Sequence, residues 1–255
     1  NKNYCSVDGG LYNKQKTTIL HPGKIQNGTF RIPDGVTSIG DYAFAFNRYV
    51  KTIAIGDTVI SIGNYAFYNC SSLQNVTYGN GLQSIDEYAF AGCSALSMFN
   101  SESANTAVLG KNITTIGQYA FQNCGSLKAI TVENSVTSVG VAAFMGCNSV
   151  ESIILPFIGT NNDATTRYTQ VFGYIFGYTT GNTAGTIEQV SGYYYYIPAS
   201  LTSVVITQET VLAENAFTGC ANITSIELDA VQSIADYAFY GCDGLVSLTI
   251  RAQTV

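Results

Sequence analysis

Cysteine is the residue type in this chain with the widest chemistry, and six of the seven cysteines recur in the phrase Ala-Phe-x-x-Cys. Thiolates bind zinc and act as nucleophiles, and thiols can oxidise to disulfides. No two cysteines are spaced as Cys-x-x-Cys and His21 is the only histidine, so the ligand spacing of a zinc site is missing. The six recurring cysteines are Cys70, Cys93, Cys124, Cys147, Cys220 and Cys242.

Two interpretations of these cysteines remain open. If each phrase marks one turn of a coil, the thiols form a column whose Cα spacing is near the roughly 4.4–6.8 Å that a disulfide permits. Parallel side chains in a column make the required S–S torsion unfavourable, which favours small buried thiols instead. Asn47 in the Cys position of a seventh copy agrees, because asparagine can bond to backbone but cannot bridge. Cys5 lies outside the column and has no evident partner.

Other catalytic groups are sparse. The chain has no Gly-x-Ser-x-Gly elbow, and His21 beside Pro22-Gly23 is interpreted as a turn residue. Glu133, Glu227 and Asp229 are expected at outward strand positions, where Glu227 and Asp229 could pair to bind calcium or hydrolyse a glycoside. The simpler interpretation is solvated surface charge. The sequence therefore predicts no enzyme activity, no metal site and no cofactor.

The elements that would position these residues follow from an internal repeat. Its most regular marker is the phenylalanine of the Ala-Phe phrase, which recurs as Phe44, Phe67, Phe90, Phe121, Phe144, Phe217 and Phe239. Successive intervals are 23, 23, 31, 23, 73 and 22. The interval of 31 indicates an insertion of eight residues in one turn, and the interval of 73 predicts about three turns plus a few residues. The sequence therefore predicts a coil with about 23 residues per turn, a period typical of solenoid repeats.

Each repeat has the apolar pattern Leu-x-x-Ile-x-Ile, then Val-x-x-Ile, then Ala-Phe-x-x-Cys. The alternating residues predict a short strand with one buried face, which must stack on its neighbours to be stable. The Val-x-x-Ile segment is expected to turn back across the coil. The Gly40 to Phe44 segment predicts a helical turn, whose free amides Asp41 would cap. Asn64, Asp86 and Asp236 are the equivalent capping residues.

This repeat resembles the BspA-like subfamily of leucine-rich-repeat proteins. Residues 70–93, from Cys-Ser-Ser-Leu to Ala-Phe-x-x-Cys, match the subfamily pattern almost position by position, and the resemblance covers residues ~30–155 and ~196–255. It implies a leucine-rich-repeat solenoid, a parallel β-sheet coil with short helical or 3-10 turns. It also implies secreted or cell-surface proteins of bacteria and some parasitic protists, which adhere to host, matrix or other cell-surface proteins or glycans. It carries no residue-level binding site.

The chain is predicted to be one solenoid over residues 1–255. Residues 1–35 are expected to form a cap or degenerate repeats, because solenoids need atypical ends that cover their cores. Residues 36–155 and 201–255 are regular repeats. The last strand is followed by five residues, and the expectation is that the natural chain continues or that this tail protects the open end.

Residues 156–200 form a Tyr- and Gly-rich insertion that breaks the pattern. In one interpretation its aromatic residues are a hydrophobic plug over an irregular repeat. In the other, some tyrosines form a contact surface, because tyrosine offers a large amphipathic area at low entropic cost. Four consecutive tyrosines on a strand would alternate, with one pair buried and one exposed. They are Tyr193, Tyr194, Tyr195 and Tyr196.

The composition excludes several partners. A net charge of −6 argues against a nucleic-acid ligand, which needs a basic surface. No apolar run is long enough to span a bilayer, so no membrane insertion by this segment is expected. The first residues do not resemble a signal peptide, but the numbering starts without Met, so an extracellular or cell-surface location remains the expectation.

A stacked sheet has a continuous outer face, which is where solenoids usually bind. Its outward residues are mostly small and neutral, with Met98, Ile154 and Val205 as mildly apolar exceptions. Ile154 and Val205 border the Tyr-rich insertion in sequence, so the junction of insertion and sheet is the predicted binding surface. The predicted function is a non-catalytic adhesion or binding module; the alternatives are a structural spacer within a longer surface protein and a glycan-processing domain.

Overall fold

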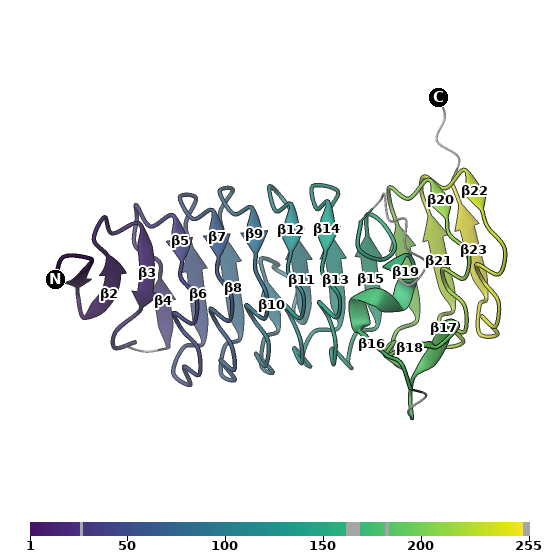
Figure 1. Ribbon diagram of the computed structural model, residues 1–255, viewed down its shortest axis with the longest axis horizontal. Coiled ribbons are helices and arrows are strands. Elements are labelled where there is room, and N and C mark those ends of the chain that lie inside the picture. The colour runs from purple at the N-terminus through teal and green to yellow at the C-terminus, as the bar shows by residue number, and fades with distance from the viewer. Residues whose placement is uncertain (26–27, 162–168, 182–183, 252–255) are drawn as a thin grey trace.

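The computed structural model describes residues 1–25, 28–161, 169–181 and 184–251. They form an elongated coil that runs from an N-terminal hairpin at one end to the last repeat at the other (Figure 1). Its main element is a ten-stranded parallel sheet, here called the long sheet, in which strands of successive repeats pair side by side. In sheet order the strands are β4 (Thr29–Arg31), β6 (Thr52–Ile55), β8 (Asn75–Tyr78), β10 (Met98–Phe99), β11 (Thr106–Leu109), β13 (Ala129–Val132), β15 (Ser152–Leu155), β19 (Ser203–Ile206), β21 (Ser225–Leu228) and β23 (Ser247–Ile250).

The predicted leucine-rich-repeat solenoid is confirmed, with equivalent strands of neighbouring repeats paired in register. Strand β6 pairs with β8, so that Ile53 lies beside Val76, and both side chains are fully buried. The alternate residues, such as Thr52 and Ala54, point outward and are only half-buried. Period-two alternation therefore fixes which face of each strand enters the core.

A second parallel sheet runs along the coil, and the sequence did not predict it. The Val-x-x-Ile segments, expected to be turns, end in two-residue strands: β5 (Ser38–Ile39), β7 (Ser61–Ile62), β9 (Ser84–Ile85), β12 (Thr115–Ile116) and β14 (Ser138–Val139). Strands β20 (Val211–Leu212) and β22 (Ser233–Ile234) form a separate pair nearer the C-terminus.

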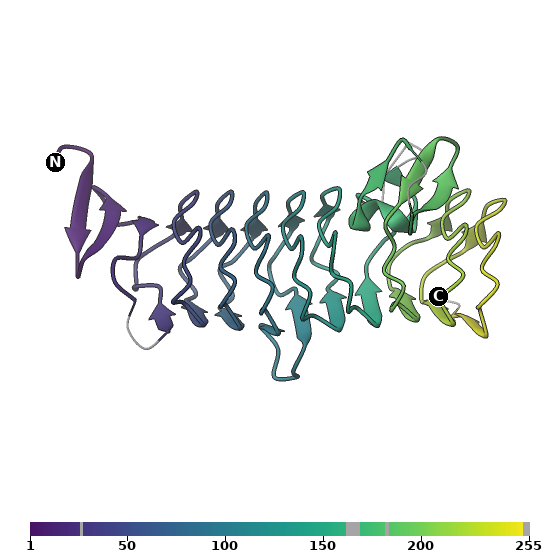
Figure 2. The same ribbon diagram turned by 90° about the horizontal axis from the view of Figure 1, so that it is seen from below.

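The N-terminal segment extends this second sheet. Strand β2 (Gly10–Asn13) pairs antiparallel with both β1 (Tyr4–Val7) and β3 (Thr18–His21), and β3 pairs in parallel with β5. The hairpin therefore stands at the end of the coil, beside the first repeat (Figure 2).

The predicted helical turns are not formed. In the first Ala-Phe turn, Tyr42 and Phe46 have φ of 57° and 60°, and left-handed residues interrupt a right-handed helix. Backbone amides alternate between bonds inside the turn and bonds to the next repeat; the Phe44 amide, for example, donates to the carbonyl of Ala66 at 2.7 Å. Asp41 was predicted to cap amides of its own turn, and this prediction is wrong. The Asp41 carboxylate accepts the amide of Asn64 in the next repeat at 2.8 Å, rather than an amide of its own turn.

The Ala-Phe turns supply the other wall of the core. Rings of successive repeats stack face to face, with centroids 4.9 Å apart for Phe67 and Phe90 and 5.3 Å for Phe90 and Phe121. Beneath them five of the six column thiols donate to the carbonyl of a phenylalanine in the preceding repeat, as Cys93 does to Phe67 at 3.1 Å. Burial raises the pKa of the Cys147 thiol to about 12. All seven cysteines are thus free thiols, and five of the six in the column are buried, as the sequence favoured.

This burial predicts how the thiols react. The thiolate is the nucleophile, so a buried thiol with a raised pKa reacts slowly. Under native conditions at pH 8 we expect iodoacetamide to modify only Cys5 and Cys242, which are half-buried, and Cys242 more slowly because burial raises its pKa. Intact-mass spectrometry should show two adducts at most, and seven after unfolding in guanidinium. A third adduct before unfolding would contradict the buried column.

Two repeats are longer than the rest. The eight extra residues of the fourth repeat let it contribute both β10 and β11, with Met98 paired to Thr106. The connection between these strands protrudes from the long sheet (Figure 2). The longer insertion leaves the long sheet unbroken, because β15 pairs directly with β19.

The chain between Phe144 and Phe217 therefore makes two repeats, not the three that the interval predicted. A 3-10 helix, η2 (Phe172–Phe176), takes the place of one Ala-Phe turn: the Phe144 amide donates to Ile175, and the Phe172 amide to Ala216. The chain then adds a small antiparallel sheet outside the coil. Its strands are β16 (Tyr178–Thr179), β17 (Ile187–Val190) and β18 (Tyr193–Tyr195).

Candidate binding surface

The outward face of the long sheet holds the three apolar residues singled out from the sequence. Ile154 on β15 pairs with Val205 on β19, so these two side chains lie side by side. Met98 lies on β10, separated from β15 by β11 and β13. Ile154 is 36% exposed, whereas Met98 and Val205 are half-buried. The accessible apolar centre of this face is therefore Ile154.

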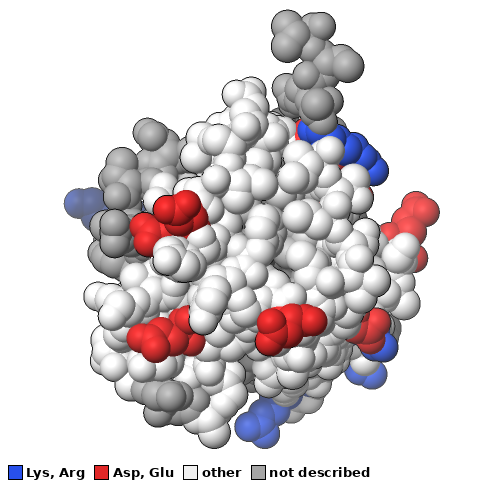
Figure 3. Space-filling view, turned by 90° about the vertical axis from the view of Figure 1, so that its right-hand side faces the viewer, with Lys and Arg blue, Asp and Glu red and all other residues white. Residues whose placement is uncertain are grey.

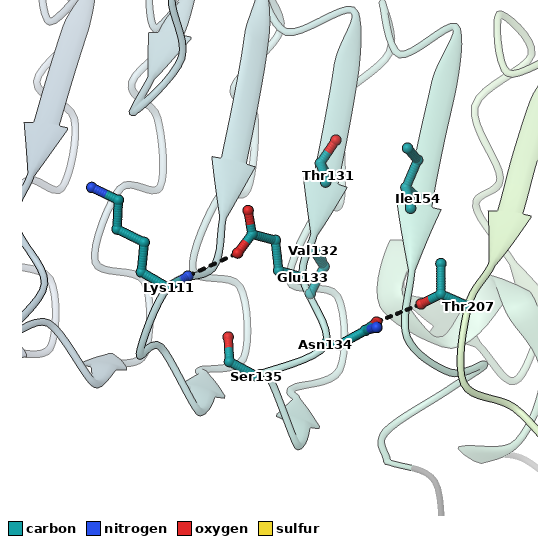
Figure 4. A pocket seen from close by; sticks show the side chains of 8 residues that line it. All are labelled: Lys111, Thr131, Val132, Glu133, Asn134, Ser135, Ile154 and Thr207. Carbon is teal, nitrogen blue, oxygen red and sulfur yellow. Dashed lines mark hydrogen bonds between the residues drawn. The ribbon is translucent and has the colours of Figure 1, made fainter.

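A shallow hollow of about 390 Å³ lies beside Ile154 (Figure 4). On one side the Glu133 carboxylate accepts the amide of Lys111 at 2.9 Å, and on the other Thr207 donates its hydroxyl to the Asn134 side chain at 2.6 Å. The remaining lining residues are Thr131, Val132 and Ser135. The hollow combines one carboxylate, a side-chain amide and hydroxyls around an aliphatic side chain, so it can hydrogen-bond a partner that covers Ile154.

The Ser135 hydroxyl has no hydrogen-bond partner among the described residues, although its oxygen atom is buried. A buried polar group without a partner costs folding free energy, and burial keeps this oxygen out of a ligand's reach. The Lys111 side chain points away from Ile154 (Figure 4), with its ammonium 5.6 Å from the ring centre of Tyr78 and 3.4 Å from the Tyr78 carbonyl oxygen.

The tyrosine run does not join this surface. Sheet β16–β18 lies on the side of the Ala-Phe turns, opposite β15 and β19 (Figure 2), so the predicted junction of insertion and long sheet is wrong. Tyr195 is fully buried and offers no contact surface, and Tyr193, Tyr194 and Tyr196 are half-buried. The expected pattern of one buried and one exposed pair is also wrong, because the strand ends at Tyr195.

The core burial supports the plug interpretation for much of the insertion. Phe172, Ile175 and Phe176 join the continuous hydrophobic core together with Phe157 and Ile158. They fill the position that an Ala-Phe turn would occupy, because the insertion contains no such phrase.

The acidic candidates are surface residues. Glu133 is exposed, and Glu227 and Asp229 are both ion-paired with Arg251. Burial raises the pKa of Glu209 to about 7, and its carboxylate accepts the amide of Ile158 at 2.9 Å. Over residues 1–25, 28–161, 169–181 and 184–251, no group of three or more His, Cys, Asp or Glu could hold a metal ion.

A column of tyrosines along the Ala-Phe turns was missed from the sequence. Tyr42, Tyr65, Tyr88 and Tyr119 stack in parallel, with successive ring centres 4.8, 4.7 and 4.7 Å apart. The signal was present, because each of the four precedes its Ala-Phe phrase directly. Residues at one repeat position fall in one column, so the recurrence of tyrosine there predicts a stack.

The family follows from the repeats just described. Residues 24–107, 97–210 and 188–255 match the model of the BspA type leucine-rich repeat region, in six copies. The chain belongs to this BspA type leucine-rich-repeat family. No protein among those of curated function matches it in sequence.

Two solved structures are similar to the chain. The first is a leucine-rich-repeat protein of T. pallidum, with 21% identity, a TM-score of 0.53 and coverage of 92% of this chain and 86% of that one. The second is the pneumococcal vaccine antigen PcpA, with 18% identity, a TM-score of 0.54 and coverage of 100% of this chain and 49% of that one. This chain thus spans about half of the PcpA structure. At these identities the likeness shows the shared solenoid fold.

Membrane insertion has no helical candidate in the described part of the chain. None of its helices has the length and apolar character needed to cross a bilayer.

Proposed function

We propose that this chain is a non-catalytic binding module displayed outside the cell, which contacts a partner protein through the outward face of the long sheet. The observation that carries the proposal is the hollow beside Ile154: an exposed aliphatic side chain at the centre of a continuous, nearly neutral face, with hydrogen-bonding groups on both sides. An apolar centre with a polar rim is the usual anatomy of a protein interface.

A protein partner suits this face better than a small molecule does. The hollow is shallow and is lined by residues on or directly after four neighbouring strands, β11, β13, β15 and β19. The small outward residues of the other repeats leave room for a partner to extend along the coil. Membership in the BspA type family supports the extracellular location, because the family resemblance implies secreted or cell-surface proteins. A second candidate function, a structural spacer, is supported by the regularity of the same face.

The experiment uses a matched pair of variants on one face. Ile154→Glu places a charge at the apolar centre, and Ala54→Glu places the same charge at an outward position of β6, far along the coil. With an array of extracellular-matrix proteins, we expect a saturable interaction that Ile154→Glu weakens by about tenfold or more, because burying an unpaired carboxylate is costly. Ala54→Glu should change it less than about twofold.

The alternative outcomes are distinct. If no protein on the array binds the wild-type chain, the spacer function is favoured. If both variants bind as the wild type does, the contact does not involve the Ile154 face, and this proposal is wrong.

A further inference from the structure

The first repeat departs from the others at four consecutive residues. Residues 46–49 read Phe-Asn-Arg-Tyr, where the next repeat has Asn-Cys-Ser-Ser at residues 69–72. In the other six copies of the Ala-Phe phrase, the position of Phe46 is always Asn or Gly. These residues are Asn69, Gly92, Asn123, Gly146, Gly219 and Gly241.

The reason for Asn or Gly is the backbone. Phe46 has φ of 60°, in the left-handed region that glycine and asparagine tolerate and that is unfavourable for a bulky side chain. A residue that covers the open end of a core should be buried, yet Phe46 is 61% and Tyr49 is 76% exposed. The Phe46 ring packs edge-on against Tyr68, with centroids 5.4 Å apart, yet most of it stays exposed, so capping does not explain these aromatic residues.

The same residues surround a hollow of about 310 Å³, here called the N-terminal hollow. Tyr42, the first ring of the tyrosine stack, is 57% exposed and lines it together with Phe46 and Tyr49. His21 enters from β3, and its Nδ1 accepts the amide of Gly23 at 3.0 Å, so in the neutral ring Nε2 carries the proton and is a donor. Arg48 completes the lining and forms no ion pair with any described residue.

Positive and negative residues are distributed unevenly along the chain. Residues 1–51 contain seven of the 11 Lys and Arg but only three of the 17 Asp and Glu, so this part carries +4 and the rest carries −10. The opposite end of the coil shows Asp and Glu side chains on a largely uncharged surface (Figure 3). An anion is therefore attracted to the end of the molecule that holds the N-terminal hollow.

We propose that the N-terminal hollow binds a carboxylated pyranose of an acidic glycan. The C–H groups on one face of a sugar ring pack against the electron-rich faces of exposed tyrosine and phenylalanine rings. The guanidinium of Arg48 can pair with the sugar carboxylate through two parallel hydrogen bonds. His21 Nε2–H is a donor for a ring hydroxyl. The small volume suits one or two sugar rings rather than a folded protein surface.

The repeat itself supplies the variants for the test. Phe46→Asn, Arg48→Ser and Tyr49→Ser each introduce the residue of the next repeat, so folding should be preserved, and Phe46→Asn should leave Tm unchanged or raise it. Calorimetric titration would compare hyaluronan hexasaccharide, which is carboxylated, with neutral chitohexaose. We expect the carboxylated sugar to bind at least about tenfold more tightly, and each variant to weaken it by about tenfold or more. Ile154→Glu, far from this hollow, should bind it as the wild type does.

Three results would overturn the assignment. The first is no saturable binding of hyaluronan hexasaccharide up to about 5 mM, a concentration at which even a weak site fills. The second is equal affinity for the two sugars, which would remove the role of Arg48. The third is equal affinity of the wild type and the variants, or displacement of the sugar by an oligoglutamate peptide of the same charge, which would mean that the site recognises charge alone.

Discussion

Replacing Phe90 by alanine is expected to lower the free energy of unfolding by about 3–5 kcal/mol, the range for deleting a fully buried phenylalanine. Phe90 is completely buried in the middle of the phenylalanine stack. Its ring stacks between Phe67 and Phe121 and meets Phe99 edge-on, with centroids 5.1 Å apart. The alanine variant loses contacts with three rings at once, and the surrounding repeats cannot close the cavity without breaking sheet register.

The Phe90→Ala substitution should also make the N-terminal and C-terminal halves of the coil unfold less cooperatively. Each repeat contacts only its neighbours, so a weak interface in the middle lowers the coupling between the N-terminal and C-terminal repeats. Urea denaturation followed by far-UV circular dichroism should then show a lower m-value or two transitions.

Phe239→Ala is the matched control, because it removes the same ring at the end of the stack. Phe239 is half-buried and has one stacked neighbour, Phe217, at 5.7 Å. Its loss should cost about 1–2 kcal/mol, in proportion to the smaller buried area. If Phe90→Ala costs no more than Phe239→Ala, the stack does not couple the repeats and the prediction is wrong.

The sequence predicted the parts of the fold that a simple period encodes. The alternation of Ile53 and Ile55, and of Val76 and Tyr78, determines the register of the long sheet because only one face of each strand can enter the core. The two-residue strands of the second sheet were missed because Ser61–Ile62 is too short to show any period.

The Ala-Phe turns were misjudged for a different reason. Tyr42 in the left-handed region violates the local preference of tyrosine, and it is stabilised there by contacts with the next repeat: the bond from its amide to the Asn64 carbonyl and the stacking of its ring on Tyr65. The enlarged repeat was also hidden, since η2 replaces the Ala-Phe phrase with residues that share its burial but not its sequence. Of the candidate site, Ile154 and Val205 were placed correctly on one face, whereas the tyrosine run lies elsewhere because the insertion folds against the turns.

That insertion depends on one buried polar side chain. Gln189 on β17 is 2% exposed, and its Oε1 accepts the amide of Gly173 in η2 at 2.7 Å. Its Nε2 donates to the carbonyl of Thr218 in the following Ala-Phe turn at 3.1 Å. A Cβ at position 173 would lie only 2.4 Å from the Cβ of Tyr195, so glycine is required where β18 crosses the helix. Gln189 therefore joins the outer sheet, η2 and the next repeat.

Gln189→Leu should destabilise the protein by about 2–4 kcal/mol. Leucine fills a similar volume, but it leaves the buried amide of Gly173 and the partly buried carbonyl of Thr218 without their partner, and each unsatisfied group costs about 1–3 kcal/mol. Glu188→Gln, on the exposed side of the same strand, keeps an oxygen acceptor for the Gly192 amide and should change stability by less than about 0.5 kcal/mol.

Hydrogen exchange would locate the effect of Gln189→Leu. Amides of β17 and β18 should exchange faster in this variant, while those of β6 and β8 stay protected because the distant repeats keep their own neighbours. Uniformly faster exchange along the whole coil would instead mean that Gln189 supports the solenoid itself and not the docking of the outer sheet.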